Sequence, residues 1–222
     1  MTARERTGIL GGTLDPIHVG HLEAAEAARQ ALALDTVLIL PARTPPHRPS
    51  EPRASGFHRF AMAALAVAAR ERMAVSDLEL LREGPSYTSL TLDHLHRFGF
   101  VASQLFFITG SDAFAEITTW HDYPRLLDLC HFVVIARPGA PLGELSRHVP
   151  GIERRVREPV TEGRAELPPS VFLIDAKTPS VSSTDIRRRV SAGESLDGLV
   201  PQVVAAHIRR CRLYSPDTVA VR

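Results

Sequence analysis

Two histidines close to the start of the chain, His18 and His21, carry side chains suited to phosphate chemistry. They lie three residues apart in the run "GGTLDPIHVGHLEAAEAARQ", which begins at Gly11. If a helix begins near residue 18, this spacing places both imidazoles on one face of its first turn. Two imidazoles beside backbone N–H donors can stabilise charge on a phosphoryl oxygen without a covalent intermediate. The segment therefore predicts a site that handles phosphate groups.

The glycine pair before these histidines favours the same interpretation. Gly11 and Gly12 follow a short apolar run at residues 7–10. A backbone without Cβ atoms can turn tightly and approach a ligand, and the free N–H groups at a following helix start favour an anion. The segment contains neither GxxxxGK[ST] nor GxGxxG, which excludes the Walker and dinucleotide-binding loops. Taken singly, a glycine pair or a first-turn histidine is more often an ordinary turn or a helix cap.

The elements that must position this loop follow from the alternation of apolar runs with segments of helical period. This alternation predicts an α/β fold with a doubly wound, mostly parallel sheet, which binds ligands at the carboxyl ends of its strands. We expect one domain over residues 1–222, with a small C-terminal helical part from about residue 180. Expected strands cover residues 7–10, 36–40, 73–80, 104–109, 131–136 and 171–175, and expected helices cover residues 20–32, 57–72, 86–98 and 123–129.

Composition limits the classes of partner. The 26 Lys and Arg residues against 25 Asp and Glu give a net charge of +1, so no nucleic-acid partner is expected. The longest apolar run is too short for a membrane span and the first residues lack a signal-peptide core, so we expect no membrane association. The sequence leaves a homo-oligomer open.

The cysteines indicate the compartment and bear on metal binding. Cys130 and Cys211 lie far apart without CxxC spacing, which favours the reducing cytoplasm and argues against a disulfide framework or a zinc site. Acidic pairs with ligand spacing are also absent, so no protein metal site is expected. The remaining histidines match no motif and are interpreted as structural or surface residues: His58, His94, His96, His131, His148 and His207.

The opening run resembles the GTFDPxHxGH signature of the nucleotidylyltransferase superfamily, with Leu14 where Phe is usual. Further motifs resemble those of bacterial nicotinate (nicotinamide) mononucleotide adenylyltransferases: "TPPHR", "GPSYTSLTL", "FITGSDAF", "TTWHDY" and "SVSSTDIRRRV". The resemblance spans Gly11 to about Arg189. It implies a Rossmann-like nucleotidylyltransferase fold and an enzyme of NAD biosynthesis. Such an enzyme transfers AMP from Mg-ATP to nicotinate mononucleotide, and gives nicotinate adenine dinucleotide and pyrophosphate.

The same resemblance implies roles for individual residues. Mg²⁺ is expected to arrive bound to ATP, and Arg48 stands where the family usually has Lys. The implied catalytic residues are His18, His21 and Thr13; the implied ATP-binding residues are Gly11, Gly12, Arg48, Gly110, Asp112, Ser183, Thr184 and Arg187; the implied substrate-binding residues are Thr88, Trp120 and His121.

The residues themselves leave alternatives open at three of these positions. Ser182 and Asp185 could form an ordinary capping box before a charged surface helix, instead of part of a phosphate site. Asp112 could cap a helix as well as bind a ribose hydroxyl. Trp120 lies in a polar stretch, which favours a stacking partner over a core residue.

Three other classes of protein share parts of this pattern. Phosphopantetheine adenylyltransferase would share the first loop, but its acceptor has no flat ring for a residue such as Trp120. A non-catalytic nucleotide-binding regulator would be marked by loss of a histidine, and both are present. A class I tRNA synthetase would need a KMSKS-like loop and an anticodon module, for which 222 residues leave little room.

Overall fold

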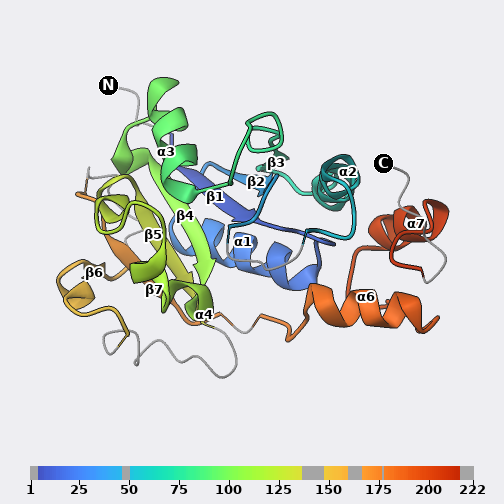
Figure 1. The fold of residues 1–222 in the computed structure, drawn as a ribbon. Coiled ribbons are helices and arrows are strands. Elements are labelled where there is room, and N and C mark those ends of the chain that lie inside the picture. Colours follow the sequence, from blue (N-terminus) through green and yellow to red (C-terminus); the bar gives the residue numbers. More distant parts are fainter. Residues whose placement is uncertain (1–4, 47–50, 137–147, 160–166, 177, 216–222) are drawn as a thin grey trace. The chain divides into compact units, whose positions relative to one another are not determined.

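The computed structural model describes residues 5–46, 51–136, 148–159, 167–176 and 178–215 (Figure 1). Its strands form a seven-stranded sheet in the order β3-β2-β1-β4-β5-β7-β6, and the pairs β1–β4, β4–β5, β5–β7 and β6–β7 are parallel. The expected α/β fold with a doubly wound, mostly parallel sheet is confirmed. The strands are β1 (Thr7–Gly12), β2 (Thr36–Pro41), β3 (Met73–Val75), β4 (Leu105–Gly110), β5 (His131–Ile135), β6 (Val156–Arg157) and β7 (Val171–Ile174).

The helices lie between the strands and after β7. The α-helices are α1 (Val19–Ala31), α2 (Gly56–Val67), α3 (Thr88–Arg97), α4 (Ser111–Phe114), α6 (Ser183–Ser191) and α7 (Gln202–Arg210). Short 3-10 helices cover Ala102–Gln104, Ile117–Thr119, Arg125–Asp128 and Ile152–Arg154.

Three expected elements are shorter than the sequence pattern suggested. The strand expected at residues 73–80 ends at Val75, because the hydroxyl of Ser76 accepts a hydrogen bond from Leu78 N and starts a turn. The helix expected at residues 57–72 ends at Val67, and Arg72 has a positive φ of 61° just before β3. The segment 123–129 contains only one 3-10 turn.

The chain divides into two compact units, each assembled from three separate segments. Unit 1 contains Met1–Gly11, Ala24–Leu38 and Tyr87–Thr178, and unit 2 contains Gly12–Glu23, Ile39–Ser86 and Pro179–Arg222. The helical part expected from about residue 180 corresponds to α6 and α7 in unit 2. The expectation of a single domain stays a prediction.

Each unit has its own packing. In unit 1, the side chains of the central strands β4, β5 and β7 are almost all buried, as expected for parallel strands covered on both faces. In unit 2, α2 and α7 pack against each other, as Figure 1 shows at the C-terminal end of the described chain. Among the residues that the structure describes, no helix combines the length and the apolar character needed to cross a bilayer.

Candidate active site

The two N-terminal histidines stack on each other where α1 begins. Their ring centroids lie 3.7 Å apart at an interplanar angle of 24°, and His18 N donates to His21 Nδ1 at 3.3 Å. His18 precedes the first helical residue, and its carbonyl accepts hydrogen bonds from His21 N and Leu22 N. The predicted proximity of the two imidazoles is confirmed, and His18 is 4% exposed whereas His21 is half-buried.

Gly20, between the two histidines, leaves room for this arrangement. A Cβ atom at Gly20 would lie 3.1 Å from His18 Nδ1 and 3.3 Å from Pro179 O. Both distances are tighter than ordinary van der Waals contact, so a side chain here would push the His18 ring from its position. Because Gly20 has no side chain, the His18 ring can occupy its observed position.

A buried arginine forms hydrogen bonds with the backbone at the start of the loop that contains His18. Arg59 in α2 is 2% exposed and donates to three backbone carbonyls: Thr13 O at 2.8 Å, Ala42 O at 2.6 Å and Ala54 O at 3.2 Å. Burial lowers the pKa of Arg59 from its usual value, and the charge of Asp15 offsets part of this effect. Arg59 thus fixes the backbone at the predicted catalytic residue Thr13.

Asp15 forms a second buried anchor in the same loop. Its carboxylate accepts from Arg53 N at 2.8 Å, from Ala54 N at 3.1 Å and from the Tyr214 hydroxyl at 2.7 Å. Burial raises the pKa of Tyr214, and the charge of Asp15 raises it further, so the hydroxyl stays protonated as a donor. Leu14, 2% exposed, adopts a positive φ of 51° beside this anchor. The loop conformation is therefore held by side chains on both sides.

The helix α6 is joined to this loop by its first two turns. Ser183 Oγ donates to Pro16 O at 2.9 Å. Arg187 Nη1 donates to Asp15 O at 2.7 Å, and Arg187 Nη2 donates to Thr184 Oγ1 at 3.1 Å. The structure thus brings these three predicted ATP-binding residues together with the loop of His18.

The capping role that the sequence also allowed for Ser182 is present at the start of α6. Ser182 is the N-cap, and its hydroxyl accepts from Asp185 N at 3.1 Å. The carboxylate of Asp185 pairs with Arg188 and Arg189 on the exposed face, and these arginines lower its pKa. Capping by Ser182 and anchoring by Ser183 therefore occur in the same helix.

In unit 1, the predicted substrate-binding residues lie around the start of α3. The rings of Tyr87 and His121 stack at 4.2 Å and 14°, and Ser89 Oγ lies 2.9 Å from His121 Nδ1. Thr88, the first residue of α3, lies between Tyr87 and Ser89 in sequence. The half-buried Trp120 meets Phe107 edge-on at 6.0 Å. Sequence analysis missed the contacts of Tyr87 and Ser89, although both flank Thr88 in the "SYTS" run that it singled out.

The remaining predicted ATP-binding residues lie at strand ends. Gly11 and Gly12 close β1, and Gly12 O accepts from Ala42 N at 2.8 Å. Gly110 is the last residue of β4 and the N-cap of α4, so the exposed Asp112 lies in the first turn and is not the cap. Arg48 lies outside the described residues.

Three residues of this site were missed by sequence analysis: Arg59, Asp15 and Tyr214. Asp15 lies in the quoted signature, but nothing local shows that it accepts from residues far along the chain. Arg59 occupies a helical stretch in which a charged residue is ordinarily solvent-facing. A charge on an otherwise apolar helix is the one available signal, and it does not identify backbone carbonyls as the partners.

Comparison with known proteins identifies the class of protein to which the chain belongs. A family model described as cytidylyltransferase-like matches residues 9–189, a span that contains the loop of His18, the start of α3 and nearly all of α6. The fold and the site therefore define a cytidylyltransferase-like nucleotidyltransferase.

Two relatives carry the name "probable nicotinate-nucleotide adenylyltransferase". The relative from Moorella thermoacetica is 42% identical over 216 residues, covering 97% of this chain and 94% of the relative. The relative from Roseiflexus castenholzii is 42% identical over 211 residues, covering 94% of this chain and 98% of the relative. This chain belongs to the nicotinate-nucleotide adenylyltransferase family, so the resemblance inferred from its motifs is confirmed.

A solved structure supports the fold. The nicotinic acid mononucleotide adenylyltransferase of Plasmodium falciparum, complexed with NaAD, matches with a TM-score of 0.71 at 16% identity. The match covers 95% of this chain and 98% of that one. The architecture is therefore shared at low sequence similarity.

Proposed function

We propose that this chain transfers the adenylyl group of ATP to nicotinate mononucleotide, giving nicotinate adenine dinucleotide and pyrophosphate. The observation that carries the proposal is the stacked pair His18 and His21 at the start of α1, held beside Gly20. The names of the relatives supply the substrate class, and NaAD in the Plasmodium structure is the expected product.

The reaction is a single displacement at the α-phosphorus of ATP. An oxygen of the 5′-phosphate of nicotinate mononucleotide forms a bond to this phosphorus. The bond from the phosphorus to the oxygen bridging toward the β-phosphate breaks, and pyrophosphate leaves with the electron pair. The attacking phosphate is already anionic at neutral pH and needs no general base, so alignment and charge stabilisation provide the catalysis.

Residues of unit 2, together with Gly11 at the end of a unit 1 segment, are assigned to the phosphates. His18 and His21 donate to the α-phosphate region, and Thr13 positions the phosphates on a backbone that Arg59 holds. Gly11 and Gly12 let the backbone approach ATP. Mg²⁺ enters with ATP and keeps most of its waters. The charge on the departing pyrophosphate is met by Arg48 and by α6 through Ser183, Thr184 and Arg187.

The residues of unit 1 are assigned to the organic parts of the substrates. Trp120 stacks on the pyridine ring, and Thr88 with the backbone of His121 binds the nicotinate carboxylate. An anion is favoured there because helix α3 begins at Thr88 and its first N–H groups have no partner within the helix. Gly110 and Asp112 are assigned to the nucleoside of ATP.

The deciding experiment measures pyrophosphate release from Mg-ATP with a panel of acceptors. We expect turnover with nicotinate mononucleotide and none with 4′-phosphopantetheine. Turnover with phosphopantetheine alone would identify the other adenylyltransferase, and binding of ATP without turnover on any acceptor would identify a regulator.

A further inference from the structure

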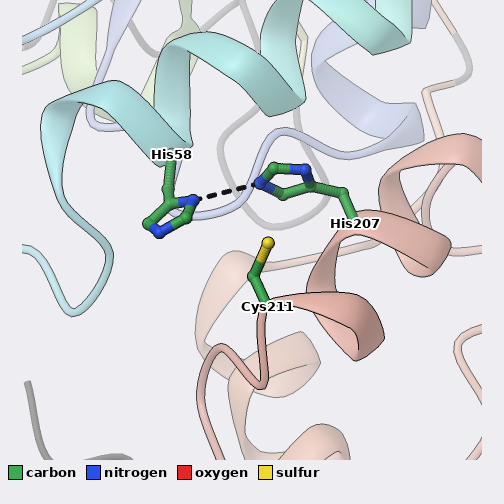
Figure 2. A group of neighbouring side chains, drawn as sticks. All are labelled: His58, His207 and Cys211. Carbon is green, nitrogen blue, oxygen red and sulfur yellow. Dashed lines mark hydrogen bonds between the residues drawn. The ribbon is translucent and has the colours of Figure 1, made fainter. Parts of the chain in front are cut away.

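A cluster of potential metal ligands lies in unit 2, formed by residues that have no assigned role in the reaction. His58 belongs to the first turn of α2, His207 lies in α7, and Cys211 directly follows α7. One ligand atom from each of the three residues lies within 4.8 Å of the others. Figure 2 shows the sulfur of Cys211 directed toward the two imidazole rings.

We propose that His58, His207 and Cys211 form a binding site for one Zn²⁺ ion, with water as the fourth ligand. Neutral imidazoles and a thiolate are the ligands that this ion prefers. Local spacing does not reveal such a site, because the two histidines lie 149 positions apart in the chain and the cysteines have no CxxC spacing. The inference does not rest on the proposed enzymatic function.

The distances suit a tetrahedral ion after a small adjustment. His58 Nδ1 and His207 Nε2 lie 3.1 Å apart. Zn–N bonds of about 2.0 to 2.1 Å keep two nitrogen ligands about 3.3 Å apart, so the nitrogens need almost no movement. A Zn–S bond of about 2.3 Å requires the sulfur about 3.5 Å from each nitrogen. Because the ligand atoms lie within 4.8 Å of one another, the sulfur must approach by roughly 1.3 Å at most.

The helices hold the ligands in place before an ion binds. His207 and Cys211 are four residues apart, so they share one face at the end of α7. That face meets the N-terminal turn of α2, because the two helices pack against each other. All three side chains are half-buried, which leaves a path for the ion and for the water that would complete its coordination.

The charges around the cluster also bear on binding. Burial lowers the pKa of His207, with smaller contributions from His58 and Arg210. The positive charge of Arg210 opposes a bound cation, and the negative charge of a Cys211 thiolate offsets it. Two imidazoles with a thiolate therefore bind a divalent ion more favourably here than two imidazoles alone would.

Binding of Zn²⁺ to this cluster releases a proton. The thiol proton of Cys211 leaves to solvent when the sulfur binds Zn²⁺. The hydrogen now shared between the two rings moves, through water, to the other nitrogen of the ring that carries it, so both rings stay neutral. One proton is released for each ion bound, which makes the affinity rise with pH.

The first test uses the full-length protein freed of metal and titrated with Zn²⁺ against a chromophoric chelator. We expect one ion per chain, with affinity reduced about a hundredfold or more in Cys211→Ser and in His207→Ala. Removing a residue that only hydrogen-bonds to a metal ligand already costs about 10–100-fold in metal affinity. His148→Ala, which removes an exposed histidine of unit 1, is the matched control and should bind as the unmodified chain does. Equal affinity in all four proteins would overturn the proposal.

A second measurement does not depend on a variant that folds. Co²⁺ added to the unmodified chain should give the visible bands of a tetrahedral ion and a thiolate-to-metal charge-transfer band in the near ultraviolet. Zn²⁺ should also raise the Tm of the unmodified chain, because an ion that binds only the folded state stabilises it. A Co²⁺ spectrum without the thiolate band, or no binding of either ion, would refute the site.

Discussion

The ring of His18 has little freedom. It stacks on His21, packs beside the bare backbone of Gly20 and is almost fully buried, so its position is set before a ligand arrives. Preorganised donors stabilise a transition state because no reorganisation is needed during the reaction. The position of the His18 imidazole can therefore be tested by substitution.

The first prediction removes the donor. His18→Ala should lower kcat by about a hundredfold to a thousandfold, the usual cost of losing one donor to the transition state, with the KM for ATP less affected. Steady-state kinetics of pyrophosphate release measure both constants. Near-normal turnover would remove His18 from the catalytic set.

The second prediction leaves His18 in the chain and displaces it. Gly20→Ala places a Cβ atom 3.1 Å from His18 Nδ1, so the ring must shift by a few tenths of an ångström. Because a misplacement of about 1 Å can cost about a hundredfold in rate, we expect this smaller shift to cost on the order of tenfold or less. We expect kcat to fall while the protein remains folded. Urea denaturation of Gly20→Ala and of the unmodified chain checks that the substitution leaves the fold stable. Unchanged kcat in Gly20→Ala would show that the ring has room to yield.

The third prediction concerns the acceptor. Nicotinate carries a carboxylate where nicotinamide carries a carboxamide, whose NH₂ would face the N–H donors near Thr88 and His121. A buried donor facing another donor costs about 1–3 kcal/mol, so kcat/KM should favour the acid by roughly tenfold to several hundredfold. The ratio of kcat/KM for the two mononucleotides at saturating Mg-ATP measures this. A ratio near one would leave the adenylyl transfer standing and refute the assigned carboxylate contacts.

At the scale of elements, α2 supports the loop in which the catalytic residues are predicted. Arg59 reaches from this helix to three carbonyls, and α6 adds Ser183 and Arg187 from a distant part of the sequence. The loop conformation is therefore determined by the helices of unit 2 as well as by its own residues.

The fourth prediction tests this support. Arg59→Met keeps the length of the side chain but leaves the buried carbonyls of Thr13, Ala42 and Ala54 without their donor. The free energy of unfolding should fall by about 3 kcal/mol or more, which urea denaturation measures. Arg70→Met is the matched control, because Arg70 makes only an exposed pair with Glu23 and should change stability by less than about 1 kcal/mol. Similar losses in both variants would contradict the role of Arg59.

The sequence predicted the elements whose residues carry their own signal. The buried strands at residues 104–109 and 131–136 and the proximity of His18 and His21 follow from local patterns of apolar residues and from helix periodicity. The ends of elements were less accurate, because Ser76 terminates β3 through a hydroxyl contact that competes with the strand. Arg59 and Tyr214 could not be assigned, since their partners are fixed only by tertiary packing.

At the scale of the whole molecule, His131 couples stability to pH. It is 2% exposed at the start of β5, its ring stacks on Phe106 at 4.6 Å, and its Nδ1 accepts from Ser170 N at 3.1 Å. Burial lowers the pKa of His131 to about 4, with a smaller contribution from the charge of Arg6. The histidine interpreted from the sequence as structural or surface is thus a neutral core residue.

The fifth prediction follows from this pKa. The unfolded chain takes up a proton as pH falls below about 6.5, whereas folded His131 resists protonation until about pH 4. Its contribution to stability is therefore full above about pH 6.5 and is lost as pH falls toward 4, by about 3 kcal/mol. Urea unfolding at several pH values should show that the unfolding free energy of His131→Phe falls between pH 6.5 and about pH 4 by about 3 kcal/mol less than that of the unmodified chain. Parallel curves for the two proteins would contradict the assignment.

The bond between Tyr214 and Asp15 joins positions 199 residues apart. Because a ribosome delivers the chain from its N-terminus, Asp15 is synthesised long before Tyr214 emerges. The growing chain can form β1 and α1 early, but the carboxylate of Asp15 gains this hydroxyl donor only after Tyr214 has been added. The order of translation therefore delays completion of the loop that contains Asp15 until nearly all of the described chain has been synthesised.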